Sequence, residues 1–306
     1  MKFKLLFLSS LLIYSCTNYE DETISLFNFL PSDSKVIVNI NDLNNTKDIL
    51  NNNNVLPILL STSKEISNQL DLLSNKNSER EGLFSLSTYG KNEIAFTYIR
   101  KSNSFDTISE VDTLKTKYQK SEIFLDEVNG EEINKVIIDQ YIVSSNKDII
   151  LENIIRDFNS AKYNIDSEFK KIIKTSDSNE PFNIYSKSDN LGIFSDKLVD
   201  ISFFPRSKTS WVGYDFNYSI KDIYLSGITR ITDSVNGKIN ILKNINPSEI
   251  KTDKIIPNSF LSFLTFSISD SERFIFNFKD YLKYNDLSTQ NFNFNSLNIV
   301  DEVSFV

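Results

Sequence analysis

The fold of this chain is decided by a stretch that reads EIFLDEVNGEEINKVII over residues 122–138. At its centre, Asn129-Gly130 is the strongest short hairpin signal in the sequence, because a two-residue type I′ turn needs positive φ angles that Asn and Gly adopt readily. Apolar-rich runs at 122–128 and 132–138 flank the turn, and YIVSS follows at 141–145. The stretch therefore predicts a β-hairpin with a third strand beside it.

The rest of the chain alternates between strand and helix patterns. In the run 35–41, Val36, Val38 and Ile40 share one face, which is the period of a half-buried strand. In the run 147–158, apolar residues recur at helical spacing instead. By the same patterns, further strands are expected at 83–88, 93–100, 182–186, 210–218, 222–232 and 260–268, and further helices after Asp42, at 56–73, 108–118 and 168–174, and after Asp270.

One strand–helix unit occurs twice, at 29–51 and at 255–283. In each copy, a turn with an apolar residue and Pro leads into an alternating strand, and a helix then starts beside an Asp. We therefore expect an α+β fold of mostly antiparallel sheets with packed helices, with the strand–helix unit repeated near the start and the end. The two copies predict either two related subdomains or one sheet that meets itself across a pseudo-symmetric interface.

These patterns also suggest boundaries. We expect an α+β body over 29–250 and the start of a second, similar unit over 251–306. The last segment, 298–306, reads as an apolar strand at the chain end, which would leave an unpaired sheet edge. One interpretation is that the second unit is truncated. The alternative is a native C-terminal edge strand.

The N-terminus has the three-part pattern of a secretory signal over residues 1–15. Lys2 and Lys4 precede an apolar run at 5–14, and a small residue, Ser15, follows it. The run is about half the length of a membrane-spanning helix. The last three residues and Cys16 resemble a bacterial lipobox, which predicts cleavage before Cys16 and attachment of a lipid such as palmitate to its thiol. The alternative is an ordinary secretory signal followed by a chance cysteine.

Residues 16–28 read as a lipidated tether. Two or more acyl chains hold a protein stably on a membrane without a spanning helix. The acidic run TNYEDET at 17–23 resembles the surface-export signals of Bacteroidota lipoproteins. It therefore predicts a lipid-anchored protein of the outer membrane that faces outward, although a solvated tether would have the same composition.

Charge and residue usage exclude several function classes. The chain has 33 basic and 41 acidic residues, and removal of Lys2 and Lys4 with the signal leaves a net charge of −10. An acidic chain does not neutralise phosphates, so nucleic acid is not expected as a partner. With no histidine and no cysteine besides Cys16, a Ser–His–Asp triad, a His-ligated zinc and a C-x-x-C redox pair are excluded. We expect no catalytic, cofactor-binding or metal-binding residue.

Three weaker patterns can be tested against the structure. The acidic pairs Asp126-Glu127 and Glu131-Glu132 could serve as general acid and base, but a hairpin tip is convex, so a charged turn is the preferred interpretation. The alternating aromatics Trp211, Tyr214, Phe216 and Tyr218 could form a ligand platform, but Trp211 is out of step with the other three, which favours core packing. Asp-Ser/Thr-apolar triplets resemble Bacteroidota O-glycosylation acceptors and mark three candidate residues: Thr107, Thr113 and Ser234.

Several short motifs, in order, resemble an uncharacterised family of Bacteroidota cell-envelope lipoproteins with a domain of unknown function. The resemblance spans most of the mature chain, and family members run longer than this chain, which implies truncation. It implies no catalytic residue, since every motif is structural. The motifs are LPSDS at 30–34, SSNK at 144–147, EFKKII at 168–173, WVGYD at 211–215, LSGI at 225–228 and IPNS at 256–259.

The sequence therefore predicts a non-enzymatic, lipid-anchored envelope protein that binds or scaffolds through its body. The first alternative is a ligand-capture lipoprotein that holds a glycan or small molecule in a cleft between the repeats. The second is a hydrolase that depends on two buried, convergent carboxylates. The protein or glycan partner is not specified by any of these patterns.

Overall fold

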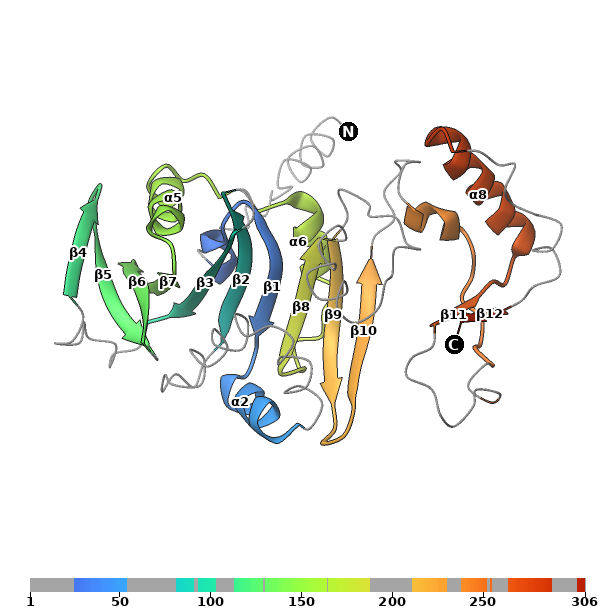
Figure 1. Cartoon of the computed structure of the whole chain (residues 1–306), viewed down its shortest axis with the longest axis horizontal. Helices are drawn as coiled ribbons and strands as arrows, with labels where there is room; N and C mark the ends of the chain where they lie inside the picture. Colours follow the sequence, from blue (N-terminus) through green and yellow to red (C-terminus); the bar gives the residue numbers. More distant parts are fainter. Residues whose placement is uncertain are drawn as a thin grey trace, which may run out of the picture.

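The computed structural model describes residues 25–53, 81–90, 93–102, 113–128, 130–163, 165–187, 211–229, 238–251, 254, 264–287 and 302–305. Within these ranges, ten strands form one antiparallel sheet in the order β10-β9-β8-β1-β2-β3-β7-β6-β5-β4 (Figure 1). Their bounds are β1 (Ser34–Ile40), β2 (Gly82–Tyr89), β3 (Glu93–Lys101), β4 (Thr113–Tyr118), β5 (Ser121–Val128), β6 (Glu131–Ile138), β7 (Tyr141–Ser145), β8 (Phe182–Lys187), β9 (Trp211–Tyr218) and β10 (Ile223–Thr229).

The expectation of an α+β fold with packed helices is wrong. One large antiparallel sheet dominates the described chain and only a few helices accompany it, so the fold is more β-rich than predicted. Part of the error lies at 108–118, where a helix was expected but Thr113–Tyr118 is strand β4, paired with β5. Thr and Lys residues suit a strand whose two faces are both exposed to solvent, and pairing with β5 overrides the helix propensity of Leu and Lys.

The stretch that predicted a hairpin forms one. β5 and β6 pair antiparallel from Ile123↔Val136 to Val128↔Glu131, and Gly130 has a φ of 82°, as a tight hairpin turn requires. β7 then pairs with β6 on its other side and with β3. The strand registers align polar residues across three strands: Asn134 of β6 lies opposite Ser145 of β7, and Ser145 lies opposite Thr97 of β3.

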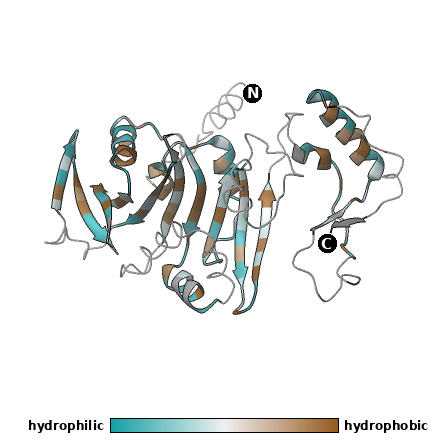
Figure 2. Cartoon of the chain, in the orientation of Figure 1, coloured by the Kyte–Doolittle hydropathy of each residue, from teal (hydrophilic) through white to brown (hydrophobic). Residues whose placement is uncertain are grey.

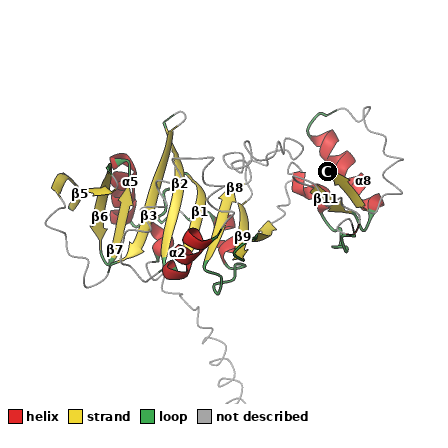
Figure 3. Ribbon diagram, turned by 60° about the horizontal axis from the view of Figure 1, so that its bottom comes forward, coloured by secondary structure: helices red, strands yellow, loops and turns green. Residues whose placement is uncertain are grey.

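Helices cover both faces of the sheet. α5 (Asp148–Asn159), α6 (Ser167–Ile173) and the 3-10 helix η1 (Leu26–Phe29) pack on the face that presents Ile37, Leu83 and Val143. α2 (Leu43–Asn52) lies on the other face, where Leu43 joins a cluster with Val36 and Phe84 (Figure 3). Leu26, expected in the tether, is therefore part of the packed body.

Burial falls from the centre of the sheet to its edges. All five residues of β7, and six consecutive residues of β2, are buried. At the edges, five of the six residues of β4 are exposed, and so are five of the seven residues of β10. Because central strands are covered on both faces, they read as nearly continuous apolar or small residues rather than as an alternation.

A second, two-stranded sheet pairs β11 (Leu264–Ser267) with β12 (Glu302–Phe305). Helix α8 (Ser271–Tyr284) follows β11, and its hydrophilic and hydrophobic residues alternate in bands (Figure 2). Asn277 on α8 donates to the carbonyl oxygens of Ile241 and Lys243, beside the 3-10 helix η2 (Lys238–Leu242). Residues before the expected boundary at 250 thus contact the helix that follows β11.

The two strand–helix units share their helix start. Asp42 accepts a hydrogen bond from the Asn45 backbone N–H at 3.0 Å, and Asp270 accepts one from Arg273 at 2.8 Å. Each aspartate is therefore the N-cap of its helix. β1, however, lies inside the large sheet, whereas β11 lies in the small one. The helix expected at 56–73 lies outside the described residues.

Candidate functional site

A hollow of about 400 Å³ opens where helix α5 begins. Its walls come from the end of β2, the bulged edge strand β4, strand β6 and the first turns of α5. A volume of this size is in the range that small-molecule sites occupy. The lining residues are Tyr89, Lys115, Glu132, Asn134, Asn146, Lys147, Asp148, Ile149 and Glu152.

Lys115 enters the hollow because β4 is bulged there. The pairing between β4 and β5 shifts between Leu114 and Thr116, so Lys115 is an extra residue with no direct partner on β5. Bulges re-aim side chains in this way. The Lys115 ammonium donates to Asn134 Oδ1 at 2.9 Å and lies 3.0 Å from a carboxylate oxygen of Asp148. Asn134 is buried, so this contact gives its amide oxygen the partner that a buried polar atom needs.

Lys147 closes the other side of the hollow. Its ammonium donates to Glu93 Oε2 at 2.9 Å and lies 5.1 Å from the centroid of the Tyr89 ring. Next to it, Asn146 Oδ1 accepts the backbone N–H of Phe96 at 3.0 Å. These contacts fix the turn between β7 and α5 against the ends of β2 and β3.

The hollow is polar, and its cations are already paired. Two lysines and three carboxylates line it, and each lysine is held by a carboxylate. An arrangement of this kind offers hydrogen-bond donors and acceptors and one aromatic ring to a neutral, hydroxyl-rich ligand. Across the described ranges, no group of three or more carboxylates, histidines or cysteines could hold a metal ion.

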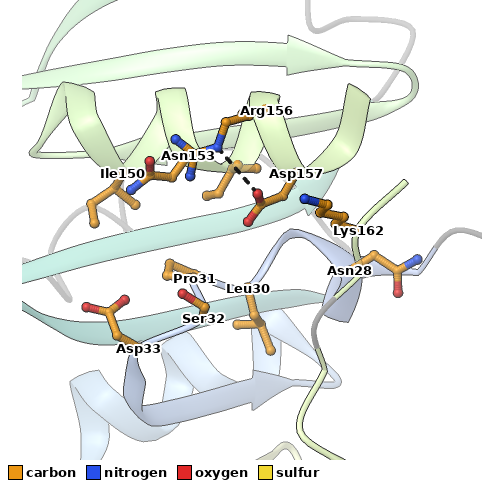
Figure 4. Close-up of a pocket in the computed structure, with 11 residues that line it drawn as sticks. Asn28, Leu30, Pro31, Ser32, Asp33, Ile150, Asn153, Arg156, Asp157 and Lys162 are labelled. Carbon is orange, nitrogen blue, oxygen red and sulfur yellow. Dashed lines mark ion pairs between the residues drawn. The ribbon is translucent and has the colours of Figure 1, made fainter. Parts of the chain in front are cut away.

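A second, smaller hollow lies along the same helix (Figure 4). It measures about 60 Å³ and lies between α5 and the turn over Leu30–Asp33. Arg156 and Asp157 form an ion pair at its rim, with 3.7 Å between nitrogen and oxygen. Its volume suits a few water molecules.

The acidic residues of the hairpin do not converge. Asp126 lies opposite Ile133, and Glu127 lies opposite Glu132, so Asp126 and Glu132 point to opposite faces of the sheet. Asp126 is 4.0 Å from the ammonium of Lys135 on one face, while Glu132 borders the hollow on the other. Glu127 is exposed.

The aromatic residues of β9 divide between the two faces, as the sequence spacing predicted. Trp211 is buried against Phe169 of α6, with 4.5 Å between ring centroids, and its indole N–H donates to Asp166. Phe216 is buried on the opposite face and stacks on Phe182 at 4.1 Å. These rings are core, so they do not form a ligand platform.

Most of the single residues marked by sequence lie outside the described ranges. They are Cys16, Thr107 and Ser234. Thr113 is described: it is the first residue of β4 and is exposed. No hydrolytic pair emerges from the predicted carboxylates, and the hollow beside α5 was not predicted. Of its lining residues, only Glu132, in an acidic pair, and Asn146 and Lys147, in the SSNK motif, stood out in the sequence.

Comparison with known proteins does not indicate a family or a function for this chain. No protein-family model matches this chain, and no curated protein matches it. A solved structure described as crystal form I of TP0453 is similar over 64% of this chain and 75% of that chain, with 9% sequence identity and a TM-score of 0.35. A likeness at that level supports neither a shared fold nor a shared function.

Among the described residues, no helix is both long and apolar enough to cross a membrane.

Proposed function

We propose that this chain is a lipid-anchored cell-envelope protein, held on the outer membrane through acylated Cys16, that acts by binding or scaffolding and not by catalysis. The proposal is supported by the signal pattern over residues 1–15 and by the position of the chain's one cysteine directly after it. The acidic run at 17–23 supports display on the outer surface.

The observation that carries the non-catalytic part is the chemistry of the α5 hollow. Lys115 and Lys147, its two amines, are engaged by Asp148 and Glu93. Amine or carboxylate catalysis needs a group aimed at a substrate with its protonation tuned to the reaction. Paired charges that tie together β4, β6 and the start of α5 are instead typical of a binding surface on a rigid scaffold.

The anchor is tested by Cys16→Ala in the native host. The variant should lose its lipid and leave the membrane fraction, whereas the matched control Tyr14→Ala, which keeps the cysteine, should stay there. Retention of Cys16→Ala on membranes would contradict the anchor. Brief protease treatment of intact cells then tests display: degradation supports an outward face, and protection refutes it.

A second candidate function is capture of a neutral glycan in the α5 hollow. The observation that favours it is the combination of volume, amide groups and the Tyr89 ring in one open hollow. The site lies within the large sheet, not in a cleft between the two strand–helix units. Thermal unfolding with glucose, galactose and N-acetylglucosamine, and with their disaccharides, tests it.

Binding would raise the melting temperature as ligand concentration increases. Tyr89→Ala should abolish that rise, while Tyr284→Ala, which removes an exposed tyrosine from α8, should keep it. No rise with any of these sugars would count against this candidate and would leave the scaffolding role as the better explanation.

A further inference from the structure

Within the described part of the chain, strand β10 is an edge of the large sheet that lacks the usual protective features. It pairs with β9 over seven consecutive positions without a bulge, and it has no other strand neighbour among the described residues. Between Ile223 and Thr229 it has no proline and no charged residue. Edge strands normally carry such features because their unpaired N–H and C=O groups can accept another strand. β4, at the opposite edge, has both a bulge and lysines.

The side chains of β10 are also unusually apolar for their exposure. Tyr224 is 60% exposed, Leu225 54% and Ile228 44%. By alternation, Tyr224 and Ile228 lie on one face of the sheet and Leu225 on the other. An unpaired edge flanked by exposed apolar side chains is the surface that strand addition would cover.

The sequence of β10 is self-complementary. Tyr224 and Ile228 each lie two residues from Ser226. If two β10 strands pair antiparallel about Ser226, Tyr224 of each copy lies opposite Ile228 of the other. Aromatic and β-branched residues are favourable cross-strand partners. Leu225 then lies opposite Gly227, on the face where the Tyr214 ring covers Gly227, and no like charges meet in the seven-residue pairing.

We propose that two copies of this chain pair through β10, in an antiparallel, two-fold arrangement centred on Ser226. A two-fold interface needs a patch that complements itself, and the symmetric placement of Tyr224 and Ile228 supplies one. This symmetry favours a second copy over an unrelated strand. The pairing joins two ten-stranded sheets into one continuous sheet and covers the unpaired edge of each.

Disulfide trapping of the full chain in membranes tests the register. The chain has one other cysteine, Cys16, so Ser226→Cys introduces a thiol whose cross-link is easily assigned. Opposed positions in an antiparallel pair lie within disulfide reach. Mild oxidation should give a reducible species of twice the monomer mass. In Tyr224→Cys the two thiols would be roughly 13 Å apart along the strands, so that variant should cross-link at least tenfold less.

Thr116→Cys on the exposed edge β4 is the matched control and should stay monomeric. The proposal is overturned if Ser226→Cys does not cross-link, or if Tyr224→Cys or Thr116→Cys cross-links as readily. A cross-linked product with another protein, in place of the doubled mass, would also overturn it, because it would identify a foreign strand as the occupant.

Charge placement gives a second, independent test. Ser226→Lys puts two ammonium groups opposite each other at the two-fold axis, and Ser226→Glu puts two carboxylates there. Like charges directly opposed disfavour strand pairing. In detergent, each variant alone should have the monomer's mass, and a mixture should recover the dimer. Dimers of either variant alone, or monomers in the mixture, would contradict the pairing.

Discussion

Strands β4 and β10 are the two edges of one sheet, yet they are held in place by different means. At β4, a bulge turns Lys115 inward, where it bonds to Asn134 and Asp148. At the β10 end, the support is close packing: a Cβ on Gly213 of β9 would lie 2.7 Å from Ile172 Cγ2 of α6. One end therefore depends on partly solvated polar contacts and the other on a steric fit. Equal substitutions should have unequal effects at the two ends.

The largest effect is expected from Gly213→Val. The added side chain meets Ile172, so α6 must move away from β9, and overpacking of this kind costs about 1–3 kcal/mol. Thr116→Val on β4 introduces the same residue at an exposed position with almost no change of volume, and it should change stability by less than about 0.5 kcal/mol. The urea midpoints of the two variants measure the difference.

A second substitution tests whether the clash with Ile172 causes the loss of stability in Gly213→Val. Ile172→Ala removes the atoms that the introduced valine side chain would meet, so the double variant should lose less stability than the two single losses combined. If Gly213→Val is as stable as the parent chain, the β10 end does not depend on this close fit.

An intermediate effect is expected at Asp166, which caps α6 and accepts the Trp211 indole N–H. Burial acts to raise the pKa of Asp166, but hydrogen bonds from Trp211 and from the backbone of Glu168 and Phe169, with the charge of Lys187, lower it overall. Asp166→Ala should cost about 1 kcal/mol at pH 7, as the loss of an N-cap usually does. Asp166→Asn keeps a capping oxygen and removes only the charge.

The pH dependence of stability separates the contribution of the capping oxygen of Asp166 from that of its charge. A carboxyl with a lowered pKa in the folded state stabilises the fold above its unfolded pKa of about 3.9, and that stabilisation is lost as the pH falls through the folded value. The difference between the parent and Asp166→Asn should therefore fade below about pH 4, while the deficit of Asp166→Ala persists. A difference that grows on acidification would contradict the assigned direction. Melting temperatures from about pH 2.5 to 7 provide the measurement.

The smallest effect is expected from Asp148→Asn at the β4 end. Lys115 and Asp148 are each about one-third exposed, and pairs of this kind contribute less than about 1 kcal/mol. The loss should shrink further in about 1 M salt, where exposed charges are screened. Lys117→Gln breaks the more exposed pair with Glu122 and should have no measurable effect. If Asp148→Asn destabilises as much as Gly213→Val, the two ends are not held differently.

Local sequence patterns predicted the described strands apart from β4, and the described α-helices, because those depend on neighbouring residues. The Asn129-Gly130 pattern predicted the β5–β6 pairing that is observed, and the spacing of Trp211 from Tyr214 predicted that their side chains lie on opposite faces. The single sheet was not predictable in this way. β1 pairs with β8, and Val36 lies opposite Ser186, although no local pattern links two segments so far apart in the chain.

The α5 hollow could not be predicted for the same reason. Lys115, Asn134 and Asp148 come from three separate elements, and they meet only because β4 is bulged and β6 has a particular register. To predict the hollow, 113–118 would have to be recognised as a strand, but the sequence pattern predicted a helix there. The Asp-started helices after β1 and β11 were visible in sequence, because an N-cap is a contact within one helical turn.

The mass of the N-terminal peptide of the protein, purified from membranes of its native host, tests the proposed anchor most directly. The proposal predicts a peptide that begins at Cys16 and carries the added mass of two or three acyl chains. A peptide that begins elsewhere, or one that contains an unmodified Cys16 thiol, would contradict it.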